Sequence, residues 1–173
     1  MIVVSDTSPL NYLILVGCVD VLPQVFGQVY APPLVLIELG HPRSPMPVRT
    51  WAASPPEWLN LKEPEAIDPS LNLDPGETAA IALAEELKAD RLLIDERDGR
   101  DVAKQRGLSV VGTLNVLNEA AELNLINLPE VIEQLKATSF HVSAKLIQDI
   151  LQLDQERKLA REQERRNGPT LEP

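Results

Sequence analysis

Several residue types are scarce in this chain, and each scarcity excludes a class of site. Cys18 is the only cysteine, which excludes an internal disulfide and a cysteine-rich zinc site. Because it lies in an apolar segment, we expect it to be a buried small hydrophobe. Histidine occurs only at positions 41 and 141, so a histidine-rich metal site is not expected either. Aromatic residues make up only 3% of the chain, so aliphatic side chains must fill the core.

Long apolar stretches and an excess of positive charge are also missing. The opening segment MIVVSD lacks the basic region of a signal peptide, so we expect a cytoplasmic protein that does not contact membranes. The formal net charge is −10, the wrong sign for passive nucleic-acid binding, which needs clustered lysine and arginine. Any contact with nucleic acid must therefore be local, unless bound metal balances much of the acid.

Apolar runs and helix signals alternate along the chain. Strands are predicted at 2–4, 29–31, 58–61, 91–94 and 108–111, and helices are predicted to begin at Ser8-Pro9, Pro32-Pro33, Val48, Asp74-Pro75, Arg97, Thr113, Pro129 and Ser143. In the first helix we expect Ser8 to be the cap and Pro9 the first helical residue. We expect Thr113 to cap the helix that it starts. Alternating strands and helices of this length predict an α/β protein with a parallel sheet and helices on both faces.

The last predicted helix carries an apolar stripe and then a charged tail. Four aliphatic residues at helical spacing form the stripe: Leu146, Ile147, Ile150 and Leu151. The stripe can pair with a second copy in a homodimer or pack back on its own domain. Residues 154–166 are highly charged, and we expect this helix end to fray and residues 167–173 to be disordered. We therefore predict a domain over 1–140 and a helical extension over 141–166.

Acidic residues stand where a parallel sheet presents ligands, outside the carboxyl ends of its strands. Asp6 follows the first strand, and Asp95 follows the strand at 91–94. Glu38 and Glu77 lie on helices, each beside the apolar face of its helix. Burying such carboxylates together is unfavourable unless a cation neutralises them. Because oxygen ligands suit Mg²⁺ or Mn²⁺, the sequence predicts a divalent-metal site.

Each acid also has an interpretation that needs no metal. Asp6 can be a turn residue at a strand end, and Glu38 can be a boundary residue whose carboxylate reaches water. Glu77 stands at the third helical position after Asp74, which is the pattern of a capping box. Asp98 lies at the start of a helix, where an acid favourably meets the macrodipole, although it can also be an outer metal ligand.

Three basic residues recur at helical spacing just after Asp95: Arg97, Arg100 and Lys104. They can meet phosphate groups that enter the site. Equally, they can form a solvated face that pairs with acids on the same helix. The sequence leaves these two interpretations open.

Four segments together resemble the PIN-domain family. They are VVSDTSPL, LVLIELGHP, DPGETAAIALA and LLIDERDGRDVAKQRGLSVVGTLNVL; they occur in the family's order and cover about residues 1–125. The likeness is greatest to the small prokaryotic branch related to toxin-type (VapC-like) ribonucleases. The resemblance implies a three-layer PIN-like fold, in which a parallel sheet has helices on both faces.

The resemblance also assigns roles by position. The family's metal-binding acids match Asp6, Glu38, Glu77 and Asp95. Many toxin-type relatives have aspartate at the third of these positions, so the glutamate is a departure. A further family acid falls between Glu96 and Asp98, and the supporting hydroxyl matches Ser8 or its neighbour Thr7.

The activity that the resemblance implies is hydrolysis of RNA by an endoribonuclease that uses Mg²⁺ or Mn²⁺. Such an enzyme can be the toxin of a pair, held in check by a small antitoxin protein. The alternative is a catalytically weak or inactive PIN-like module that binds RNA or protein, which the net charge and Glu77 favour. An aspartyl-phosphate enzyme would need a second aspartate two residues after Asp6, where Ser8 stands.

Overall fold

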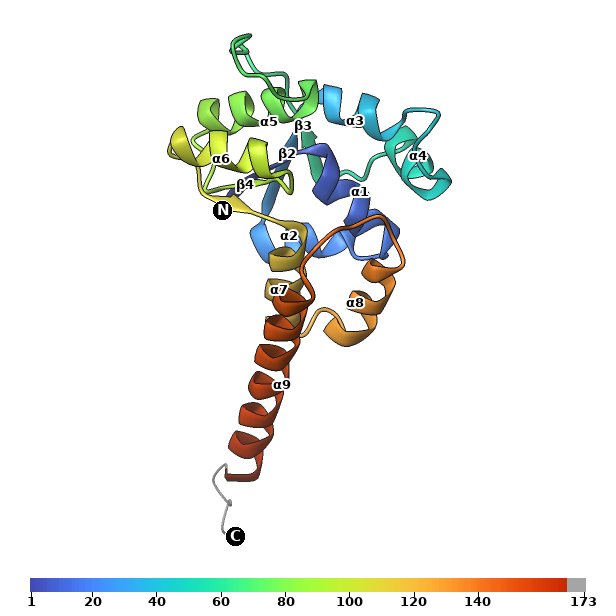
Figure 1. Cartoon of the computed structure of the whole chain (residues 1–173), viewed down its shortest axis with the longest axis vertical. Coiled ribbons are helices and arrows are strands. Elements are labelled where there is room, and N and C mark those ends of the chain that lie inside the picture. The colour runs from blue at the N-terminus through green and yellow to red at the C-terminus, as the bar shows by residue number, and fades with distance from the viewer. Residues whose placement is uncertain (168–173) are drawn as a thin grey trace.

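A parallel sheet forms the centre of the computed structural model, which describes residues 1–167 (Figure 1). Its strands are β1 (Ile2–Ser5), β2 (Gln28–Ala31), β3 (Leu59–Leu61), β4 (Arg91–Leu93) and β5 (Val110–Val111). They pair in parallel in the order β3-β2-β1-β4-β5. β5 starts two residues later than predicted, because the Leu108 N–H donates to the Ala103 carbonyl and closes the preceding helix instead.

Helices connect the strands and follow the last one. They are α1 (Thr7–Leu15), the 3-10 turn η1 (Val19–Val21), α2 (Leu22–Phe26), α3 (Pro33–Leu39), α4 (Met46–Ala53), α5 (Pro75–Glu86), α6 (Arg97–Gln105), α7 (Thr113–Glu122), α8 (Leu128–Lys136) and α9 (Ala144–Asn167). The predicted cap of α1 was wrong. Asp6 keeps an extended backbone and is the N-cap residue, so Ser8 already lies inside the helix. Likewise Gly112, not Thr113, is the N-cap residue of α7.

Helices cover both faces of the sheet, as the alternating pattern predicted. Val3 belongs to the larger core, to which α1, α2, α3, α7, α8 and α9 contribute. Val4, the next residue along β1, belongs to the other core, together with Ile81 of α5 and Ala103 of α6. Successive residues of a strand face opposite sides of the sheet, so the two cores lie on opposite faces. The fold is therefore a three-layer α/β fold.

β1 and β4 are neighbours at the point where the strand order reverses. From β1 the chain proceeds through β2 to β3 on one side, and then returns to β4 and β5 on the other. The Asp6 N–H donates to the Leu93 carbonyl at 2.9 Å, which fixes the end of β1 against β4. Open α/β sheets bind ligands outside the carboxyl ends of their strands at such a switch point. Asp6 and Asp95 follow these two strands and lie at that edge.

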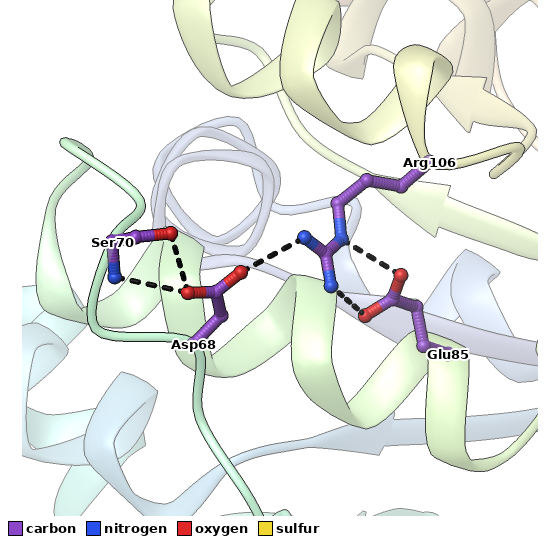
Figure 2. Close-up of polar contacts among 4 residues, drawn as sticks. All are labelled: Asp68, Ser70, Glu85 and Arg106. Carbon is purple, nitrogen blue, oxygen red and sulfur yellow. Dashed lines mark hydrogen bonds and ion pairs between the residues drawn. The ribbon is translucent and has the colours of Figure 1, made fainter.

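Hydrogen bonds from Arg106 attach the loop between β3 and α5 to α5 (Figure 2). The Arg106 guanidinium, which follows α6, donates two hydrogen bonds to Glu85 at 2.8 and 2.9 Å and one to Asp68 at 3.1 Å. Asp68 in turn accepts from the N–H and the hydroxyl of Ser70. The loop leads directly to Asp74, the N-cap residue of α5. The hydrogen bonds of Arg106 therefore fix the path of the chain into α5.

α9 packs back on its own domain with its first half and extends beyond the domain with its second (Figure 1). Ile147 and Ile150, 8% and 7% exposed, join the larger core. The charged second half, which we expected to fray, continues as helix to Asn167. Residues 168–173 of the predicted disordered tail lie outside the described residues.

Contacts with α7 explain why the charged part of α9 stays helical. Asp154 is 2% exposed and pairs with Lys158 at 2.7 Å. Arg157 donates to the Asn118 side chain at 2.6 Å, and Arg161 donates to the Glu122 carbonyl in the last turn of α7 and to the side chain of Asn124, two residues beyond it. Charged residues that were predicted to be solvated therefore bind α9 to α7.

The helices nearest the N-terminus are largely buried. Leu10, Leu13, Leu22 and Phe26 are at most 2% exposed, and Cys18 is buried as expected. Within residues 1–167, no single helix is both long and apolar enough to cross a membrane. Among the helices described, one pair, Thr7–Leu15 with Val19–Phe26, meets that test of length and composition when taken together, and a bend of 116° separates the two.

Candidate functional site

Asp6 is a buried carboxylate at the end of β1. The residue is 2% exposed, and its Oδ1 has no hydrogen-bond partner among residues 1–167. Burial raises the pKa of Asp6 from its ordinary value of 3.8 to about 7; the amides of Thr7 and Ser8 lower the pKa, and the charges of Glu77 and Glu38 raise it. The two amides therefore compensate the charge of Asp6 only in part.

Glu38 comes from α3 and joins the starts of two other helices. The Thr7 hydroxyl donates to Glu38 Oε2, and the Gly76 N–H donates to Glu38 Oε1 at 2.9 Å. Gly76 leaves no room for a side chain, because an added Cβ would lie 2.8 Å from the Glu38 carboxyl carbon. The carboxylate is thus held between α1 and α5. Thr7, rather than the predicted Ser8, supplies the hydroxyl in this contact.

Glu77 uses its two carboxylate oxygens differently. Oε2 accepts the Asp74 N–H at 3.3 Å and completes a capping box at the start of α5. Oε1 is buried with no hydrogen-bond partner in the described residues. Burial raises the pKa of Glu77, the hydrogen bond from Asp74 lowers it, and the charges of Glu96 and Asp98 are among those that raise it. The capping interpretation is confirmed, and it leaves one oxygen for another partner.

Asp95 lies at the same sheet edge but is engaged with α7. The Thr113 N–H donates to Asp95 Oδ1 at 2.7 Å, and the Thr113 hydroxyl donates to Oδ2 at 2.6 Å. Burial raises the pKa of Asp95, whereas the Thr113 hydrogen bonds and the charge of Arg100 lower it. Arg100 also donates to the Ile94 carbonyl at 3.2 Å. Asp95 is therefore clamped to the start of α7.

Three of the four predicted acids form one electrostatic group. The charges of Glu38 and Glu77 both act on Asp6. Glu96, the N-cap residue of α6, and Asp98 in its first turn extend the group toward solvent. Both line an open pocket of about 390 Å³ together with Glu77. Asp98 is exposed, so it stands at the entrance to the acidic group.

A second pocket, of about 370 Å³, begins at Asp95 and runs along α6 to the segment before α9. Its lining includes all three predicted phosphate-binding residues: Arg97, Arg100 and Lys104. The Arg97 side chain is 92% exposed, and its Nε lies 3.9 Å from Asp101. An exposed pair at that distance contributes little. Arg100 is turned toward the end of β4 instead.

A family model described as a PIN domain matches residues 2–156. The chain belongs to the PIN-domain family. PIN domains are typically nucleases and generally use divalent metals, which supports nuclease activity in general terms. No curated protein and no solved structure matches this PIN domain significantly. The matched range runs into α9, and our division at residue 140 stays a prediction.

The acids of this PIN domain fit a divalent cation in their chemistry. Asp6 and Glu77 each present a buried oxygen that has no hydrogen-bond partner in the part of the chain that the structure describes, and Mg²⁺ and Mn²⁺ take oxygen ligands. In residues 1–167, however, no group of three or more acidic, histidine or cysteine side chains is arranged to hold a metal. Glu38 and Asp95 use both of their oxygens for hydrogen bonds within the protein.

Two features of the PIN domain's site were not predicted from the sequence. Thr113 was assigned only as a cap, whereas it binds Asp95 with two groups. Gly99 gives Glu77 its space, because an added Cβ would lie 2.6 Å from Glu77 Oε1 and 2.6 Å from Ile94 Cδ1. A glycine inside a helix costs about 1 kcal/mol relative to alanine. Gly76 and Gly99, in the first turns of two helices, therefore signalled a close approach.

Proposed function

We propose that this PIN domain is an endoribonuclease of the toxin-type prokaryotic branch, which hydrolyses RNA phosphodiester bonds with Mg²⁺ or Mn²⁺. One observation carries the proposal: within the described residues 1–167, Asp6 and Glu77 each bury a carboxylate oxygen without a hydrogen-bond partner at the switch point of the sheet. Two buried acids whose charges the protein compensates only in part are unfavourable near each other unless a cation binds. Asp6, Glu38 and Glu77 would hold that cation, with Asp98 at the entrance.

Each acid has its own task in this proposal. A divalent ion supplies electrostatic stabilisation for the charge that develops on the phosphate. Asp6 gives up its proton to offer a charged oxygen, and Glu38 offers a carboxylate that Thr7 already positions. Asp95 keeps the start of α7 against the sheet edge through Thr113.

Cleavage of a labelled single-stranded RNA tests the proposal. We expect cleavage with Mg²⁺ or Mn²⁺ and none with EDTA. Asp6→Asn keeps the shape of the side chain and removes its charge, and we expect the rate to fall at least about 100-fold, since disturbing only the support of a ligand already costs 10–100-fold. Asp149→Asn, exposed on α9, is the matched control. If Asp6→Asn cleaves as fast as the wild type, the proposal is overturned.

A second function, a non-catalytic PIN-like module that binds RNA or protein, is favoured by a different observation. Glu38 and Asp95 already use both carboxylate oxygens, and the described residues hold no ready set of three metal ligands. For such a module we expect RNA to bind but to stay intact with Mn²⁺. Asp6→Asn would then bind the RNA as well as the wild type does.

The toxin role, the antitoxin partner, a homodimer and a cytoplasmic location stay predictions from the sequence. Induced expression in bacterial cells tests the toxin role, because a toxic nuclease arrests growth and Asp6→Asn should relieve the arrest at equal protein level. Light scattering during size-exclusion chromatography tests the homodimer. A monomer at every concentration would contradict that part of the prediction.

A further inference from the structure

The pocket along α6 continues directly from the acidic site. Arg97 lines both the acidic pocket and the second pocket, and Asp95 stands at the inner end of the latter. Glu96 and Asp98 line only the acidic pocket, whereas Arg100 and Lys104 line only the second pocket. A linear substrate that extends from the acids past Arg97 enters the second pocket.

The second pocket gathers positive charge in a chain whose formal net charge is −10. Its charged lining comprises three cations and two acids: Arg97, Arg100, Lys104, Asp95 and Asp101. Among residues 1–167, Lys104 has no acidic partner within 4.0 Å. Cations that the protein does not neutralise are the groups that contact the phosphates of nucleic acids.

Besides α6, the pocket is lined by α7, by the segment before α9 and by the first turn of α9. Asn115 is exposed in the first turn of α7, and His141 lies in the segment before α9. His141 Nδ1 lies 2.6 Å from the Ser139 carbonyl; because a carbonyl oxygen only accepts, Nδ1 carries a proton and Nε2 is left for a ligand. The apolar part of the lining is Leu114, Phe140, Val142 and Leu146. A nucleic-acid base can lie against such a surface.

We propose that this pocket binds one nucleotide of single-stranded RNA beside the acidic site, with Arg97 and Lys104 on its phosphate and Asn115 and His141 opposite them. A volume of about 370 Å³ is in the range of small-ligand pockets. The lining matches a nucleotide, whose phosphate is charged and whose base is flat and largely apolar on its faces. The choice of ligand rests on the proposed ribonuclease function.

Binding without cleavage tests this pocket. A short end-labelled RNA is titrated with the protein in EDTA, and fluorescence anisotropy is followed at several salt concentrations. Lys104→Ala and Arg97→Ala should each weaken binding roughly three- to tenfold and lower the slope of log K against log salt by about 0.7. Lys88→Ala removes the same charge from an exposed position beyond the far end of α5 and should do neither.

A neutral variant separates the pocket from general electrostatics. Asn115→Ala should weaken binding while the salt slope stays that of the wild type. Lys104→Ala with wild-type affinity and slope overturns the nucleotide pocket, even if the wild type cleaves RNA. Loss of binding in the pocket variants supports it, even if the wild type cleaves no RNA with Mg²⁺ or Mn²⁺. The experiments therefore test the nucleotide pocket and the nuclease function independently of each other.

Discussion

Protonation of the buried Asp6 carboxyl links the site to the stability of the chain. In the folded protein its pKa is about 7, whereas the ordinary value is 3.8. Between these two values the folded state holds a proton that the unfolded state has lost, so the free energy of unfolding falls as pH rises. Above about pH 7 both states are ionised, and the fall ends. The raised pKa values of Glu77 and Asp95 act in the same direction.

We therefore expect the metal-free chain to lose up to about 1.4 kcal/mol of stability per pH unit through Asp6, between about pH 4 and about pH 7. Asp6→Asn should lack this component and exceed the wild type in stability at about pH 8. Urea unfolding in EDTA across this range measures both. Asp149→Asn should follow the wild type. If the free energy of unfolding depends on pH in the same way for Asp6→Asn and the wild type, the pKa of Asp6 is not raised.

Gly76 allows the position of Glu38 to be changed with little effect on stability. Gly76→Ala brings a Cβ within 2.8 Å of the Glu38 carboxyl carbon, so Glu38 must shift. Alanine in turn favours the helix over glycine by about 1 kcal/mol. We expect RNA cleavage to fall at least about tenfold and the free energy of unfolding to change by no more than about 1 kcal/mol. If Gly76→Ala cleaves RNA at the wild-type rate, the position of the Glu38 carboxylate does not matter for cleavage.

The spacing of residues indicated which acids to consider, but not what each oxygen does. For Glu77 the sequence offered a cap and a metal ligand as alternatives, whereas one oxygen caps α5 and the other has no hydrogen-bond partner within residues 1–167. Asp95 was expected to face the other acids, and its oxygens are bound by Thr113. These assignments depend on side-chain torsions and on which helix packs beside each strand. Sequence periodicity encodes neither.

At the scale of elements, Asp95 joins the end of β4 to the start of α7. Thr113 is fully buried, so Asp95→Ala leaves its N–H and hydroxyl without partners, at a cost of about 1–3 kcal/mol. We expect Asp95→Ala to lower the free energy of unfolding at about pH 8, where Asp6→Asn raises it. Urea unfolding compares the two, with Asp149→Ala, exposed on α9, as the control. Unchanged stability in Asp95→Ala would mean that the clamp is dispensable.

α9 supplies a second test at this scale. Asp154 is 2% exposed and lies 2.7 Å from Lys158 and 3.9 Å from Arg157. Asp154→Ala removes the acid that both cations contact. We expect the free energy of unfolding to fall by about 1–3 kcal/mol and the amides of α9 to exchange hydrogen faster. Asp149→Ala, exposed on the same helix, should change neither quantity. If the amides of α9 exchange as slowly in Asp154→Ala as in the wild type, the ion pairs of Asp154 do not stabilise this helix.

The boundaries of elements were predicted well where the signals were local. The Pro32-Pro33 start of α3 and the Ser143 start of α9 agree with the structure, and Ser143 caps through its hydroxyl. The start of α1 was misplaced, because Asp6 is set by pairing with β4 rather than by the Ser8-Pro9 signal. The end of α9 was misjudged because its partners lie about forty positions away on α7.

At the scale of the whole molecule, the alternation of apolar runs predicted the fold class but not the strand order. The order β3-β2-β1-β4-β5 places β1 beside β4, although almost ninety positions separate Asp6 from Asp95. Such long-range pairing is what creates the switch point. The same arrangement separates an acidic pocket from a basic one across α6, which a net charge alone cannot reveal.

Calorimetric titration of Mn²⁺ into the metal-free protein at neutral pH tests most directly whether the acids at the switch point form a divalent-cation site. We predict saturable binding by the wild type and by Asp149→Asn, and binding at least about tenfold weaker by Asp6→Asn. Absence of saturable binding to the wild type, or equal binding to Asp6→Asn, would contradict the assignment of Asp6, Glu38 and Glu77 as the metal centre.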